Sequence, residues 1–192
     1  CDPVGWGVDL MSLSAHKIGG PKGVGALYTA PALRNLRPLL PGGGQEGGLR
    51  SGTEATAQIA GFARAVALRQ ENLAEKLRHM ADIKAYCREK LLSIPGVVPV
   101  GQGEAPHILA VSLVGYPSAN IVTDLGAKGI CISAGSACHR GKASHVVSAL
   151  HLDKKTAAGV IRVSFGPETT RADIDGLYQA LLDHKNQRFP ML

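Results

Sequence analysis

Aromatic residues and long apolar runs are scarce in this chain of 192 residues. Phe, Trp and Tyr together make up 4% of it, so stacking platforms for single-stranded nucleic acid are not expected. No apolar run approaches the roughly 18 residues that a membrane-spanning helix needs. Hydrophobic residues are 45% and charged residues 19% of the chain, which is ordinary globular usage. The composition therefore predicts a folded protein that binds neither nucleic acid nor a membrane.

The cysteines lack the spacing of a disulfide framework. They are Cys1, Cys87, Cys131 and Cys138, with no tight C-x-x-C pair. An unpatterned set in a chain of this size is typical of reduced thiols, so we expect a cytoplasmic protein. Cys131 lies between two isoleucines and Cys87 lies on an apolar helical stripe. We expect both thiols to be buried, and Cys131 to be inert.

Metal-binding patterns are missing as well. A site built from Cys131, Cys138, His139 and His145 would not have the spacing of a zinc finger or ribbon, so no metal site is predicted. Lys and Arg number 21 and Asp and Glu 15, which gives a net charge of +6. This mild excess could steer an acidic partner, but it does not by itself indicate nucleic acid.

The pattern of apolar and turn residues predicts a mixed α/β fold. Expected strands cover residues 8–14, 23–28, 97–100, 107–114, 129–133 and 160–165. Expected helices start at a Ser118 cap, cover residues 144–150, and run from a Thr170 cap to about His184. Loops rich in glycine and turn residues are expected over 15–22 and 41–48. The chain starts Cys1-Asp2-Pro3, shortly before a strand, and we interpret it as the C-terminal part of a longer protein.

One very long helix is expected in the middle of the chain. Apolar residues recur mostly every three or four positions from Ile59 to Leu91, which is helical periodicity. The residues Ser51-Gly52-Thr53-Glu54 have the spacing of a capping box at its start. So long a helix would bridge two domains, with or without a kink.

Two short segments near the N-terminus could bind a phosphorylated carbonyl compound. Lys17 follows His16 in a turn-rich loop, and lysine forms Schiff bases with carbonyl cofactors. Ser14 and His16 could donate hydrogen bonds to a phosphate. The amides at the start of the expected long helix, together with the Thr53 hydroxyl, would also suit phosphate. The alternatives are a solvated lysine in a turn and an ordinary helix cap.

Two further residues could bind or attack a substrate. Cys138 follows a run of small residues and precedes His139 and Arg140; nearby cations favour the reactive thiolate. Arg162 lies between two apolar residues of an expected strand. An inward guanidinium there would require an anion, and a substrate carboxylate fits its planar fork. Alternatively, Arg162 simply faces solvent.

Four motifs follow one another along the chain: residues 9–17 with 20–23, residues 42–46 leading to 49–54, residues 133–138, and residues 161–166. Together they resemble the pyridoxal-phosphate-dependent cysteine desulfurases of the class-V aminotransferase family, in their long-loop class. The resemblance implies the α/β architecture of the fold-type I pyridoxal-phosphate-dependent transferases. Residues 1–65 would form the C-terminal part of the large cofactor-binding domain. Residues 66–192 would form the connecting helix and a small α+β C-terminal domain with the catalytic cysteine loop.

The resemblance also implies a cofactor site. Pyridoxal 5'-phosphate would be held by Lys17 as the Schiff-base lysine and by Ser14 and His16 as phosphate ligands. Thr53 would reach the phosphate of the neighbouring subunit in a homodimer. The family's upstream half supplies the groups that face and stack on the cofactor ring, and those groups are not in this chain.

The implied reaction converts L-cysteine to L-alanine. Arg162 would hold the substrate carboxylate, and Cys138 would accept the sulfur as a persulfide for an acceptor or iron–sulfur scaffold protein. The alternatives are a selenocysteine lyase on the same scaffold and a non-catalytic fragment that binds a partner. We expect these 192 residues alone to be inactive, with the first 50 or so ordered only against an upstream half or another chain.

Overall fold

The computed structural model describes residues 2–33, 36–134 and 145–191. By its contacts the chain divides into two compact units, which we call unit 1 (Cys1–Leu73) and unit 2 (Ala74–Leu192). The expected boundary at residue 65 lies inside a helix of unit 1. The assignment of the two parts to a large and a small domain stays a prediction.

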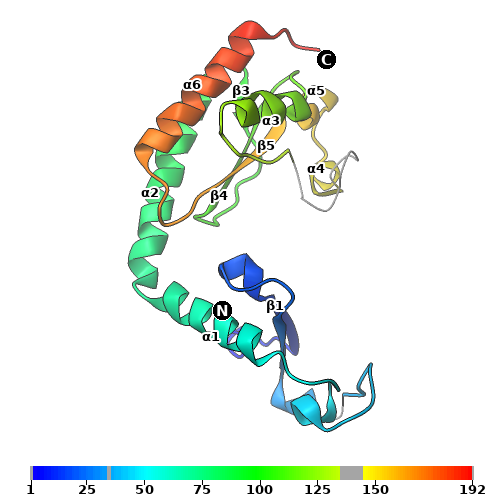
Figure 1. Cartoon of the computed structure of the whole chain (residues 1–192). Helices are drawn as coiled ribbons and strands as arrows, with labels where there is room; N and C mark the ends of the chain where they lie inside the picture. Colours follow the sequence, from blue (N-terminus) through cyan, green and yellow to red (C-terminus); the bar gives the residue numbers. More distant parts are fainter. Residues whose placement is uncertain (1, 34–35, 135–144, 192) are drawn as a thin grey trace. The chain divides into compact units, whose positions relative to one another are not determined.

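Unit 1 is a two-stranded sheet beside one helix (Figure 1). Its elements are β1 (Leu10–Ser14), the 3₁₀ turn η1 (Ala15–Ile18), β2 (Gly25–Thr29), η2 (Pro31–Leu33), η3 (Gln45–Gly48) and α1 (Thr56–Gln70). β1 and β2 pair antiparallel, with Leu10 opposite Thr29 and Ser14 opposite Gly25. The two strands expected here are confirmed. The segments expected as loops contain η1 and η3.

The expected helix start at residues 51–54 is wrong. Helix α1 begins at Thr56, and its N-cap residue Ala55 makes no side-chain capping bond. Instead, the Ser51 hydroxyl donates to the Leu40 carbonyl at 3.0 Å. The capping-box pattern fails because its hydroxyl is used in a loop contact that is distant in sequence.

The single long helix is interrupted. α1 ends at Gln70 and α2 (Leu73–Leu92) begins three residues later. Between them Asn72 has φ 52°, a left-handed conformation that no α-helix contains. The apolar periodicity is real on both sides of the break, so periodicity alone could not locate it.

Unit 2 is a three-stranded antiparallel sheet covered by helices (Figure 1). The strands are β3 (Val97–Pro99), β4 (Ile108–Leu113) and β5 (Val160–Ser164), in the order β3-β4-β5. The helices besides α2 are α3 (Ser118–Ala127), α4 (His145–Ala149), α5 (Lys154–Ala158) and α6 (Arg171–Gln187). These strands were all expected from the sequence, whereas α5 was not.

The core of unit 2 lies between one face of the sheet and the helices α2, α3 and α6. The strands contribute alternate residues, such as Val111 and Leu113 of β4 and Ile161 of β5, and α2 contributes Leu91. Alternation along a strand places these side chains on one face and their neighbours on the other. Cys87 belongs to this core, as expected, and burial raises the pKa of its thiol to about 12.

Of the two helix caps expected in unit 2, one is confirmed and the other is wrong. The cap at Thr170 is confirmed: its hydroxyl accepts from the Asp173 amide, and the Asp173 carboxylate accepts from the Thr170 amide. The Ser118 cap is wrong, because Ser118 is the first helical residue and Pro117 is the N-cap.

The strand expected over residues 129–133 is reduced to a single bridge between Ser133 and Arg162. Gly129, with φ 78°, follows the end of α3, and its amide donates to Gly126. Cys131 is exposed rather than buried. Its neighbours Ile130 and Ile132 pack against the core, so alternation turns the thiol outward. No helix in the described ranges is long and apolar enough to cross a membrane.

Candidate functional site

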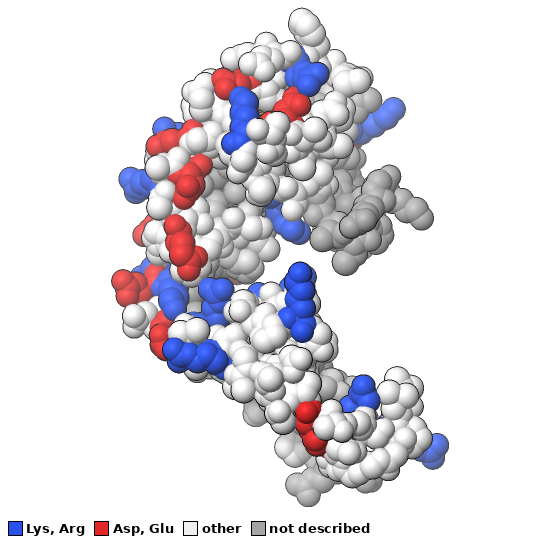
Figure 2. Space-filling view, viewed as in Figure 1, with Lys and Arg blue, Asp and Glu red and all other residues white. Residues whose placement is uncertain are grey.

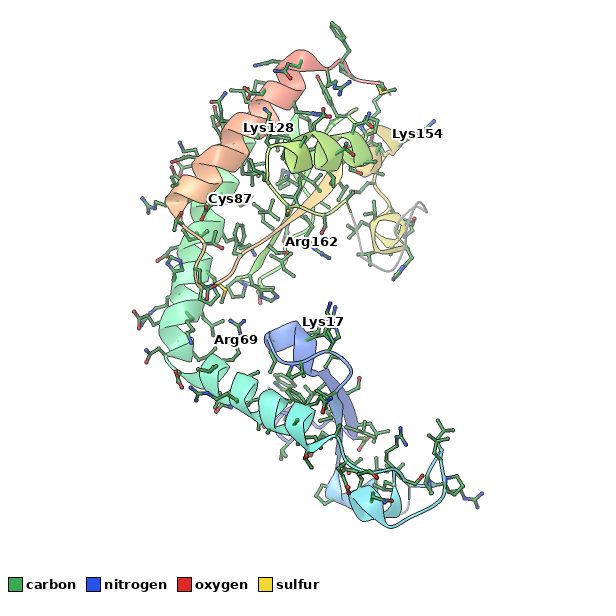
Figure 3. The ribbon with its side chains drawn as sticks, in the orientation of Figure 1. Lys17, Arg69, Cys87, Lys128, Lys154 and Arg162 are labelled. Carbon is green, nitrogen blue, oxygen red and sulfur yellow. The ribbon has the colours of Figure 1, made fainter. Side chains whose placement is uncertain are left out.

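The three polar residues Ser14, His16 and Lys17 lie together in one turn of unit 1. Figure 3 labels Lys17 in this turn. Ser14 ends β1 and is the N-cap of η1. His16 and Lys17 lie within η1, and their side chains are exposed. Ala15 between them is fully buried. One buried methyl group therefore anchors a turn whose neighbouring polar groups all remain accessible.

The backbone closes this turn directly after Lys17. Gly19 has φ 85° and ends η1 in the left-handed conformation, which glycine adopts without strain. The Gly20 amide then donates to the Ala15 carbonyl at 2.9 Å. The hydroxyl, imidazole and amine of the turn match the phosphate and the aldehyde of pyridoxal phosphate, so these residues fit that end of the cofactor.

Thr53 lies on a separate loop of unit 1. It is exposed, three residues before the start of α1. The neighbouring Gly52 has φ 115°, and its amide donates to the Gln45 side chain at 3.4 Å. Since α1 does not use Thr53 as its cap, the hydroxyl remains accessible for a ligand.

Arg162 lies on β5 of unit 2, on the sheet face opposite the helical core (Figure 3). It stands across from Ala110 of β4 in the antiparallel register. The side chain is half-buried, and within the described part of the chain its Nε atom is buried without a hydrogen-bond partner. A buried donor without a partner costs free energy, so the guanidinium is poised for an acceptor such as a carboxylate.

Ser133 contacts Arg162 through both backbone and side chain. The two residues exchange amide-to-carbonyl hydrogen bonds of 3.1 and 2.7 Å. The Nη2 atom of Arg162 also donates to the Ser133 hydroxyl at 3.4 Å. The sequence predicted Ser133 as the end of a strand and as a small residue before the thiol, but not as a partner of Arg162. Its distance in sequence from Arg162 left no pattern that could have shown the pairing.

Cys138 lies outside the described residues, as do His139, Arg140 and Lys142. Its predicted role as the nucleophile therefore stays a prediction, and so do the predicted roles of the other site residues. Among the residues that the structure describes, no group of three or more His, Cys, Asp and Glu side chains could hold a metal ion.

A charged cluster that the sequence did not reveal joins α3 to the end of α6. The Asp124 carboxylate accepts from His184 Nδ1 at 2.8 Å and from Arg188 at 3.1 and 3.2 Å. Arg188, and then His184, hold the pKa of Asp124 below its usual value.

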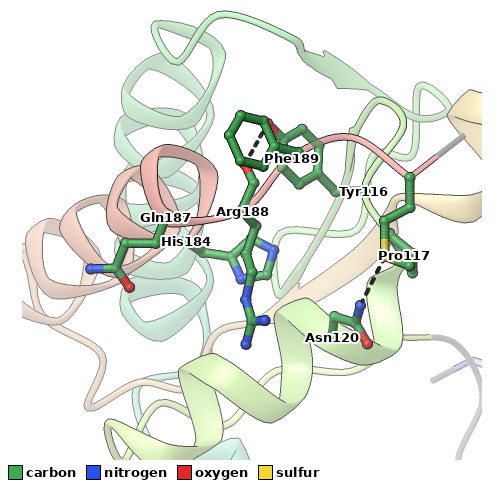
Figure 4. Close-up of a pocket in the computed structure, with 8 residues that line it drawn as sticks. Tyr116, Pro117, Asn120, His184, Gln187, Arg188 and Phe189 are labelled. Atoms are coloured by element: carbon green, nitrogen blue, oxygen red, sulfur yellow. Dashed lines mark hydrogen bonds between the residues drawn. The ribbon is translucent and has the colours of Figure 1, made fainter.

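His184 and Arg188 also line a pocket of about 300 Å³ with Tyr116 and Asn120 (Figure 4). Residues near the C-terminus also border this pocket. The Tyr116 hydroxyl holds this segment by donating a hydrogen bond to the Arg188 carbonyl at 3.3 Å.

Charges of both signs are mixed over the helices of unit 2 on the face drawn in Figure 2. Lys128, for example, pairs with Asp183 at 2.9 Å and Lys90 with Asp175 at 3.0 Å. The side chains of these pairs are about a third to a half exposed, and such pairs contribute little to stability.

Known proteins resemble this chain along most of its length. The sequence model of the family described as aminotransferase class-V matches residues 1–177. The "Cysteine desulfurase IscS" of Clostridium botulinum is 37% identical over 191 residues, which are 96% of this chain and 48% of that protein. The mitochondrial cysteine desulfurase of Arabidopsis thaliana is 41% identical over 180 residues, 88% of this chain and 38% of that protein. The X-ray structure of a NifS-like protein from Rickettsia africae has a TM-score of 0.85 at 28% identity, covering 96% of this chain and 49% of that one.

The family match covers most of the chain, and the chain therefore belongs to the class-V aminotransferases. The expected fold class, that of the fold-type I pyridoxal-phosphate-dependent transferases, is confirmed by the NifS-like structures. The resemblance to cysteine desulfurases is confirmed by the relatives of that name. The chain spans about half the length of the bacterial relative, or less in the case of the plant one.

Proposed function

We propose that this chain is the half of a pyridoxal-phosphate-dependent cysteine desulfurase that carries the lysine, the nucleophilic cysteine and the carboxylate-binding arginine. The observation that carries the proposal is the turn at the end of β1. There Ser14, His16 and Lys17 are exposed around the buried Ala15, in a chain of the class-V aminotransferase family.

The cofactor would be held by its phosphate and its aldehyde. Ser14 and His16 would donate to the phosphate, and the Lys17 amine would hold the aldehyde carbon. When bound, pyridoxal phosphate serves as an electron sink for the bonds at the α carbon of an amino acid. Lys17 would move the proton at that carbon as general base. Thr53 supplies a hydroxyl to the phosphate of a second copy in a homodimer.

The substrate would be held by its carboxylate on Arg162, whose buried Nε lacks a partner within the described residues. The Cys138 thiolate attacks the sulfur of L-cysteine, so a sulfur–sulfur bond forms as the carbon–sulfur bond breaks. The electron pair of the broken bond stays with the carbon that becomes L-alanine after protonation. The persulfide on Cys138 then passes its sulfur to an acceptor or iron–sulfur scaffold protein, and we expect this to occur in the cytoplasm.

The first test is where the cofactor attaches. In the protein completed by its upstream half, we expect pyridoxal phosphate, followed by borohydride reduction and peptide mapping, to modify Lys17 ahead of the other lysines. Lys17→Ala should remove this adduct, whereas Lys22→Ala, a change in the same turn, should leave it. An adduct spread evenly over the lysines would contradict the proposal.

The alternative function is binding of a partner without catalysis. Alanine production from L-cysteine separates the two: we expect none from the 192 residues alone. In a protein completed by the upstream half, we expect production that Lys17→Ala abolishes.

A further inference from the structure

The turn that carries Lys17 is fastened to α1 by an arginine near the end of that helix. Nε of Arg69 donates a hydrogen bond of 2.9 Å to the carbonyl oxygen of Ile18, the residue directly after Lys17. The two partners are 51 residues apart in sequence. Figure 3 shows Arg69 on α1 beside the segment that bears Lys17.

The guanidinium also lies against the next residue of the turn. A Cβ atom added to Gly19 would stand 3.1 Å from Nη2 of Arg69. Two features therefore favour glycine at position 19: its φ is 85°, and the Arg69 guanidinium lies close to where a Cβ atom would stand. The space beside the turn is shaped for this side chain.

A second contact holds the far end of the same turn. A Cβ atom on Gly61 of α1 would stand 2.7 Å from Cγ of Pro21, so the helix approaches the turn there without a side chain between them. Residues 61 and 69 are about 12 Å apart along the helix axis. The Lys17 turn is thus held at two points on one rigid helix.

The bond to Ile18 satisfies a carbonyl that the turn itself leaves open. The last carbonyls of a helical turn have no partner within it, and the closing bond made by the Gly20 amide goes to Ala15 instead. Arg69 is the donor that reaches Ile18 within the described part of the chain. Its planar, always charged guanidinium bonds one group through Nε while its other nitrogens cover Gly19.

We propose that Arg69 is a positioning residue for Lys17, which rests on the proposed function of that lysine. By holding the Ile18 carbonyl, Arg69 prevents the peptide between Ile18 and Gly19 from rotating. The backbone one residue after Lys17 is therefore fixed, and with it the point from which the lysine side chain leaves the turn. Arg69 itself touches neither cofactor nor substrate in this assignment.

The test measures backbone protection in the protein completed by its upstream half, where we expect the turn to be ordered. In Arg69→Met, amide exchange at Gly20 should rise about tenfold, as expected for losing one net hydrogen bond. Exchange in β1 and β2 should stay unchanged. Arg64→Met is the matched control, because Arg64 lies on the same helix and its Nη1 atom lies 3.8 Å from Glu71 rather than on the turn. Arg69→Lys should restore part of the protection.

The second readout is the selectivity of cofactor attachment. Pyridoxal phosphate and borohydride should modify Lys17 less selectively over Lys22 in Arg69→Met than in Arg64→Met. Unchanged exchange at Gly20 would overturn the positioning role. So would an equal rise throughout β1, since that would mean a general loss of stability. If Lys17 is not labelled in the unaltered chain, the proposed function fails, and the exchange result still decides whether Arg69 holds the turn.

Discussion

Unit 1 and unit 2 differ in how many of their apolar side chains are buried. In unit 1 the buried hydrophobic residues of the described part are Ala15 and Ala65, whereas Trp6 is 63% and Leu27 60% exposed. Unit 2 has a continuous core drawn from a sheet and three helices. Unit 2 therefore has the means to fold by itself. In contrast, we expect the chemistry-bearing turn of unit 1 to gain most of its apolar contacts from protein outside these 192 residues.

The largest effect that tests this comparison concerns the closed core of unit 2. With iodoacetamide under native conditions, Cys87 should react far more slowly than the exposed Cys131, because burial shields the Cys87 thiol and raises its pKa to about 12. The exposed Cys131 is the internal reference. Mass spectrometry of the labelled peptides measures both rates, and comparable rates would mean that the core of unit 2 opens readily.

The next effect compares one leucine from each unit. Leu91→Ala removes a fully buried side chain and should lower the free energy of unfolding by about 2–5 kcal/mol. Leu27→Ala, on the exposed β2, should change it by less than about 0.5 kcal/mol in the same chain. Urea unfolding followed by circular dichroism measures both.

The leucine pair also shows how the comparison could fail. If Leu27→Ala lowered the free energy of unfolding as much as Leu91→Ala, another protein surface would have to cover the face of β2, for example that of a second copy of the chain. Repeating the measurement at several protein concentrations separates that case, because association makes apparent stability depend on concentration.

The smallest effect concerns the charged cluster between α3 and α6. Asp124→Ala should lower the free energy of unfolding by about 1–3 kcal/mol at neutral pH, because the buried His184 loses its hydrogen-bond acceptor. Asp183→Ala, which breaks the partly exposed pair with Lys128, should lower the free energy of unfolding by clearly less. Unfolding free energies at pH 7 measure the difference.

The pH dependence of this cost has a definite sign. Arg188 and His184 lower the pKa of Asp124 in the folded state. Its contribution is therefore fully present above the ordinary carboxyl pKa of about 3.9, and it is lost as the pH falls through the lowered value. The stability difference between the unaltered chain and Asp124→Ala should shrink below about pH 4. A difference that is constant with pH would mean that packing rather than charge accounts for the cost.

Local patterns determined much of the secondary structure from the sequence. The strands around residues 10–14 and 108–113 and the capping box at Thr170 were all recovered, because strand patterning and cap chemistry act over a few residues. The grouping of Ser14, His16 and Lys17 was equally visible, since neighbours in sequence must be neighbours in space. The family resemblance supplied their roles, which the structure alone does not assign.

Only the tertiary structure decided the remaining features, because each depends on partners far apart in sequence. The Ser51 hydroxyl bonds the distant Leu40 carbonyl instead of capping a helix. Ser133 pairs with Arg162 across 29 residues, and Arg69 holds the Lys17 turn across 51. A hydrogen bond to a distant backbone group leaves no periodic trace in the sequence, so folding of the chain is what brings its donor and acceptor together.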